Sequence, residues 1–77
     1  MSGQTAALIV QRLRTVDRLL AEADKELRAI WKLTYELPEH EPDRAHACAG
    51  TYYSGRAMGA IALLRGDVTQ ALEAYTR

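Results

Sequence analysis

The chain has 77 residues, ten basic and ten acidic side chains, and one cysteine, Cys48. This length allows one small domain over residues 1–77, and a single cysteine excludes an internal disulfide. The even charge balance excludes the strongly basic surface that is typical of nucleic-acid-binding domains.

A heptad pattern of apolar residues runs through the first half of the chain. Its members are spaced alternately by four and three residues, and neither Gly nor Pro occurs between Gly3 and Pro38. This spacing predicts one long helix over about residues 4–37, packed against other helices. Four further apolar residues lie beside the pattern and widen it, which favours a bundle of three or more helices. They are Leu8, Leu19, Trp31 and Leu33. The pattern consists of Ile9, Leu13, Val16, Leu20, Ala23, Leu27, Ile30, Thr34 and Leu37.

Two prolines, Pro38 and Pro42, mark the clearest break in the chain. Proline cannot continue a helix and favours extended backbone before it, so residues 38–42 are predicted to form a linker. The segment around it is acidic and could steer the protein toward a basic partner. Its acidic residues are Glu36, Glu39, Glu41 and Asp43.

The histidines near this linker, His40 and His46, together with Cys48 and the carboxylates, include donor types that zinc accepts. Their spacing matches no recognised zinc site, and residues 46 and 48 would point to different sides of a helix. We therefore predict no metal site and no other cofactor.

A second helix is predicted over about residues 43–65, antiparallel to the first. It contains Gly50, Gly55 and Gly59, and glycine in a helix interior indicates the close approach of another element. Residues 57–64 are apolar all round, which predicts that they are buried.

Gly66 is predicted to end this second helix with a left-handed cap, and Asp67 to begin a third helix over about residues 68–76. A second helix of this length would leave residues 4–14 of the first helix without a neighbour. Since exposed apolar surface usually marks an interface, we expect the bundle to be completed by dimerisation. The expected contact residues are Leu8, Ile9, Leu13, Val16, Leu20 and Trp31.

The last third of the chain, residues 52–77, resembles a single tetratricopeptide repeat. The resemblance rests on Met58-Gly59 in the first helix, Gly66-Asp67 at the turn, and Ala71 with Tyr75 in the second helix. Gly55 and Ala62 depart from it, because the family usually has Trp and Tyr at these places. The resemblance implies a protein-binding module.

Three other groups of residues could serve a different function. Arg12, Arg14 and Arg18 could form a basic face for nucleic acid, although Asp17 interrupts it. Tyr52 and Tyr53 with Arg56 could bind a ligand or a base, but neighbouring helical residues diverge by about 100°, so we expect one Tyr in the core and one at its edge. Leu13 to Asp17 loosely resembles the opening of all-helical chorismate mutases, which implies a site for a dianion held by Arg14, Arg28 and Lys32.

The sequence therefore predicts an all-α protein whose function is protein binding, as a homodimeric adaptor, inhibitor or regulator without enzymatic activity. We expect no small-molecule substrate, no nucleic-acid partner and no membrane association. No secretory signal or membrane-spanning segment is evident, which predicts a cytoplasmic location. The excess of Arg over Lys and the abundance of Ala indicate a GC-rich bacterial or phage genome.

Overall fold

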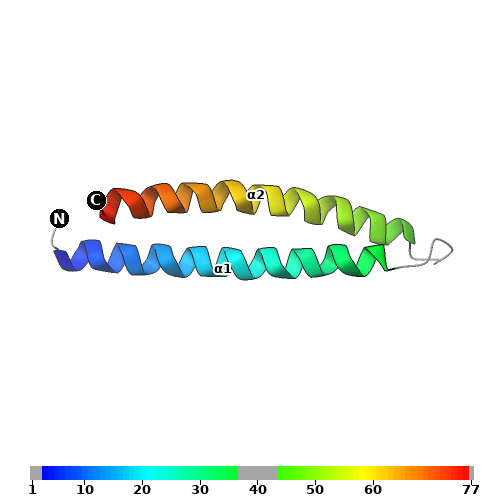
Figure 1. The fold of residues 1–77 in the computed structure, drawn as a ribbon, viewed down its shortest axis with the longest axis horizontal. Helices are drawn as coiled ribbons and strands as arrows, with labels where there is room; N and C mark the ends of the chain where they lie inside the picture. Colours follow the sequence, from blue (N-terminus) through cyan, green and yellow to red (C-terminus); the bar gives the residue numbers. More distant parts are fainter. Residues whose placement is uncertain (1–2, 37–43, 77) are drawn as a thin grey trace.

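The computed structural model describes residues 3–36 and 44–76, which form two α-helices: α1, Gly3–Tyr35, and α2, Arg44–Thr76. The helices lie side by side and antiparallel, so that the first turn of α1 and the last turn of α2 are at the same end (Figure 1). No strand occurs in these two ranges, and the all-α prediction is confirmed.

The helix pair is a rod with extents of 61 × 15 × 14 Å and a radius of gyration of 17.7 Å. A compact domain of this length would have a radius of gyration of about 11.5 Å. In the described part of the chain, each helix therefore has only the other helix as a neighbour.

The bounds of α1 agree closely with the predicted helix. Its last turn is closed by the backbone N–H of Glu36, which donates to the carbonyl of Lys32 at 3.2 Å. The predicted linker and three acidic residues of the recognition segment, Glu39, Glu41 and Asp43, lie outside the described residues.

The predicted end of the second helix at Gly66 is wrong, and so is the separate third helix. Helix α2 runs without a break from Arg44 to Thr76, and no described glycine has a positive φ. Glycine in a helix costs about 1 kcal/mol relative to alanine. Continuing the helix offsets this cost, because Val68, Ala71 and Leu72 become half-buried beside α1.

The overhang predicted for residues 4–14 is also wrong, because it followed from a short second helix. Both helices have 33 residues, and the end of α2 covers the beginning of α1. Residues 52–76 lie within one helix, so they do not adopt the two-helix form of a tetratricopeptide repeat.

Replacing Gly66 by alanine tests the continuity of α2. A Cβ at this position would meet no atom within 4 Å. Gly66→Ala is therefore expected to stabilise the protein by about 1 kcal/mol, because alanine is the better helix former. Thermal denaturation followed by circular dichroism measures the effect. A left-handed cap at Gly66 would reverse the sign, so a lower melting temperature would contradict the continuous helix.

Gly55→Ala is the matched control for this substitution. The added Cβ would lie 3.3 Å from Cζ2 of Trp31, so the indole ring would have to shift. The gain in helix propensity is therefore expected to be reduced or lost at Gly55.

The close approach predicted for the glycines thus exists at Gly55, where the neighbour is a side chain. Gly50 and Gly59 have open space around them.

The contact between the helices, which we call the hairpin seam, uses only part of the predicted heptad pattern. Leu13, Leu20, Leu27 and Thr34 belong to both, whereas Val16, Ala23 and Ile30 of the pattern are exposed. The half-buried residues of α1 in the seam are Val10, Leu13, Asp17, Leu20, Asp24, Leu27, Trp31 and Thr34. The broad apolar face of α1 is therefore divided into two stripes, and α2 covers one of them.

No hydrophobic side chain is buried among the residues whose burial is described; the one buried residue is Ser54. The prediction that residues 57–64 are buried is wrong, since Leu63 is 76% exposed and Leu64 51%. A single neighbouring helix can cover only one face of α2, so an all-apolar segment keeps most of its surface in water.

Candidate interaction surface

The second apolar stripe of α1 is the main candidate for an interaction surface, because α2 does not cover it. Successive residues of a helix turn by about 100°, which places this stripe roughly 120° around α1 from the hairpin seam. Within it, Leu8, Val16, Leu19, Ile30 and Leu33 are exposed and Ile9 is half-buried. We call these six residues, with Ala23, Arg12 and Glu26 between them, the α1 stripe.

The first half of the α1 stripe is hollowed into a shallow groove of about 300 Å³. Its lining residues are Thr5, Leu8, Ile9, Arg12, Leu13 and Val16. The structure thus brings together four of the six predicted contact residues. The other two, Leu20 and Trp31, are half-buried in the hairpin seam.

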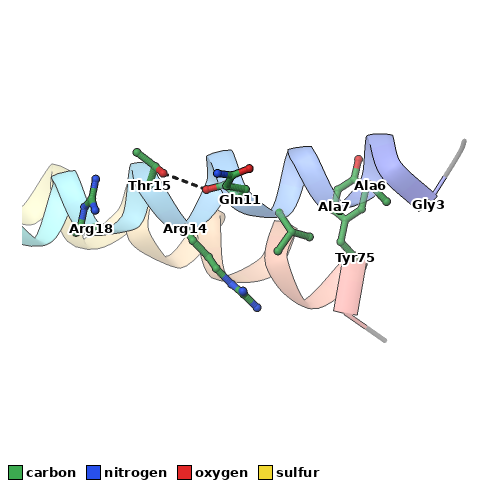
Figure 2. A pocket seen from close by; sticks show the side chains of 9 residues that line it. Gly3, Ala6, Ala7, Gln11, Arg14, Thr15, Arg18 and Tyr75 are labelled. Carbon is green, nitrogen blue, oxygen red and sulfur yellow. Dashed lines mark hydrogen bonds between the residues drawn. The ribbon is translucent and has the colours of Figure 1, made fainter.

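The opposite side of the rod carries arginines among apolar residues, and we call it the arginine side. Arg14 and Arg18 line an open groove of about 680 Å³ on this side, with Tyr75 of α2 near Ala6 and Ala7 (Figure 2). Gln11 and Thr15 also line it, and the hydroxyl of Thr15 donates to the carbonyl of Gln11 at 3.1 Å. Arg12 lies in the groove of the α1 stripe instead. The three arginines predicted to form one basic face are therefore divided between two sides.

A second groove lies farther along the arginine side. Its lining residues are Asp24, Arg28, Trp31, Met58, Gly59, Ile61, Ala62 and Arg65. Nε of Arg28 donates to Oδ2 of Asp24 at 2.7 Å, an exposed ion pair within α1. Arg14 lines the other groove, so these two cations of the chorismate-mutase resemblance do not share one pocket.

Helix α2 adds to the apolar side of the rod. The face of α2 toward α1 is marked by the buried or half-buried residues Ser54, Met58, Ile61, Arg65, Val68 and Leu72. Gly59 and Ala62 lie on one flank of this face and line the second groove, whereas Ala57 and Leu64 lie on the other flank. Ala57 and Leu64 therefore lie on the same side of the rod as the α1 stripe. We call this combined surface the apolar side.

Trp31 links the two helices near the end of α1 and the beginning of α2. Its Nε1–H donates to the carbonyl of Thr51 at 2.9 Å, and its ring lies over Gly55. The hydroxyl of Thr51 donates to that of Thr34 at 2.6 Å, and Thr34 Oγ1 lies 2.7 Å from the carbonyl of Trp31. Trp31 thus joins the two helices, and it also lines the second groove.

The middle of the seam carries an ion pair between the helices. Nε of Arg65 donates to Oδ1 of Asp17 at 2.9 Å, and a second guanidinium nitrogen lies 3.4 Å from Oδ2. The hydrogen bond from Arg65 holds the pKa of Asp17 below its ordinary value, and the attraction between the opposite charges adds to this effect. Both side chains are partly exposed, so the pair adds little to stability, but it places position 17 of α1 beside position 65 of α2.

Tyr52, Tyr53 and Arg56 form an exposed cluster on α2. The two rings are 5.1 Å apart in an edge-to-face arrangement, and the guanidinium carbon of Arg56 lies 6.0 Å from the centre of the Tyr52 ring. The expectation that one of the tyrosines belongs to a core is wrong, since Tyr52 is 61% exposed and Tyr53 63%. Tyr and Arg are enriched among residues that dominate binding energy at protein interfaces.

No group of three metal-binding side chains comes together in the residues that the structure describes. Cys48 is exposed, whereas His40 and the side chain of His46 lie outside the description. Neither described helix is long and apolar enough to span a membrane. Comparison of the chain with protein-family models, curated proteins and solved structures finds no match.

Proposed function

We propose that this protein is a small helical interaction module that works as a homodimer and regulates a partner protein by occupying its surface. The observation that carries the proposal is the lack of any buried hydrophobic residue in the described hairpin. A two-helix rod of this kind has no core of its own, and chains this small usually need disulfides, a bound metal or association with another chain to be stable.

The total accessible surface supports the same proposal. The chain exposes 6076 Å², whereas a compact monomer of 8.6 kDa exposes about 4,700 Å². The excess is roughly 1,400 Å² per chain, or about 2,800 Å² for two copies. This area lies in the range that permanent homodimers bury.

Self-association through the apolar side would leave other surfaces free for a partner. Tyr52 and Arg56 project from α2 away from the hairpin seam, and their cluster has the composition of a binding hot spot. A nucleic-acid function has weaker support, because Arg12 is separated from Arg14 and Arg18.

Sedimentation of the full chain over a range of concentrations tests the proposal. A dimer or larger species is expected at micromolar concentration, together with a helical spectrum that is lost on dilution as the copies separate. A stably folded monomer, with the same sedimentation coefficient and helicity at every concentration, would refute the homodimer. Capture of proteins from the source cell by the dimer would then identify the partner.

A further inference from the structure

The α1 stripe carries one base and one acid among its apolar residues. Arg12 and Glu26 are both exposed, and each lies seven residues from Leu19. Seven residues are two helical turns, so both side chains lie on the same line as Leu19, about 10 Å on either side of it. The stripe is thus nearly self-complementary in charge about its centre.

This symmetry distinguishes the two ways in which two copies of the stripe could meet. In a parallel pair, Arg12 would lie beside the second copy's Arg12, and Glu26 beside its Glu26, which places like charges together twice. In an antiparallel pair centred near Leu19, each Arg12 would lie beside the second copy's Glu26. Opposite charges would then meet twice, which favours the antiparallel arrangement.

The register of α2 agrees with this centre. Asp17 is paired with Arg65, so Leu19 lies at nearly the same level of the rod as Leu64. Leu64 is on the apolar side and 51% exposed. A two-fold axis near Leu19 would therefore also bring the two copies of Leu64 together. Ala57 and Ala71, seven residues before and after Leu64, would flank this contact with small side chains.

We infer that a second copy of this chain binds the apolar side in antiparallel orientation, with a two-fold axis near Leu19 and Leu64, giving a four-helix bundle. The inference rests on the homodimer proposed above and adds its orientation and register. In this assembly α1 packs against α1 and α2 against α2, each pair antiparallel, and each Arg12–Glu26 pair lies on the line of Leu19, about 10 Å along the rod from the two-fold axis.

Charge reversal tests the orientation. Arg12→Glu and Glu26→Arg are each expected to weaken dimerisation roughly 10- to 100-fold, because each replaces two attractive pairs with two repulsive ones. The double variant Arg12→Glu/Glu26→Arg restores opposite charges and is expected to dimerise as the wild type does. Lys25→Glu, a reversal outside the stripe, is the control. Sedimentation equilibrium at low salt gives the dissociation constants, and circular dichroism checks that each variant is helical.

A distance measurement decides the orientation without altering the stripe. A spin label at Cys in Glu36→Cys/Cys48→Ser would be about 50 Å from its copy along the axis in the antiparallel dimer, and within about 20 Å in a parallel one. A short distance between the labels would overturn the antiparallel register while the homodimer stands. The same conclusion would follow if Arg12→Glu and Glu26→Arg each dimerised as tightly as the wild type. A monomeric wild type would overturn both proposals.

Discussion

Leu19→Glu is expected to convert the dimer into a monomer at concentrations where the wild type is fully associated. Leu19 is 54% exposed in the hairpin and lies at the centre of the α1 stripe. Full burial of a leucine contributes about 1.5–3 kcal/mol, and a two-fold interface loses two leucines. Burial of the new carboxylates adds a further cost. Dimerisation is therefore expected to weaken by at least about 100-fold, measured by sedimentation equilibrium.

Leu63→Glu is the matched control for this prediction. Leu63 is more exposed than Leu19, at 76%, but projects from α2 away from both the hairpin seam and the apolar side. The same change of side chain should then leave the dissociation constant nearly unchanged. Equal effects of the two substitutions would show that the apolar side is not the interface. Leu13 is a poorer choice for this test, because it is half-buried in the hairpin seam and its replacement would also weaken the fold.

Trp31→Ala is expected to produce the largest loss of stability of any single side-chain truncation in the hairpin seam. The substitution removes the ring that lies over Gly55 and the hydrogen bond to the carbonyl of Thr51. Truncation of a fully buried Trp costs about 3–5 kcal/mol, and half burial reduces this to about 2–3 kcal/mol. The melting temperature should fall by about 10 °C or more, as measured by circular dichroism at fixed protein concentration.

Trp31→Phe separates the two contributions of the indole. Phenylalanine retains an aromatic ring over Gly55 but cannot donate to Thr51, so a loss of about 1 kcal/mol is expected. If Trp31→Ala melted at the wild-type temperature, the packing of the end of α1 against the beginning of α2 would not depend on this side chain. The concentration must be held constant in both experiments, because the stability of an associating protein varies with it.

The long first helix could be predicted from the sequence because its signal is local and continuous. Neither Gly nor Pro interrupts residues 4–37, and the apolar spacing has a single period. The position of the hairpin seam could not be predicted in the same way. Leu13, Leu20 and Leu27 could belong to either of two apolar stripes on α1. Which stripe faces α2 depends on Asp17 and Trp31, whose partners are on α2.

The break predicted at Gly66 shows why a strong local signal can fail. Gly followed by Asp is a typical end of one helix and beginning of the next. The residues on either side of Gly66-Asp67 favour a continuous helix instead. When the helix continues, Arg65 forms its ion pair with Asp17 and Val68 is half-buried against α1. Of the predicted contact residues, Leu8, Ile9, Leu13 and Val16 lie together because they share one stretch of α1, whereas Trp31 is directed to Gly55.

The equal lengths of α1 and α2 restrict which insertions and deletions the chain can accept. Seven residues added to α1 alone between Asp17 and Trp31 would move Trp31 about 10 Å away from Gly55 while Asp17 stayed beside Arg65. The same addition at the matching level of α2 would restore both contacts and lengthen the rod by that amount. Natural variants of this protein should therefore gain or lose residues seven at a time, and in both helices together.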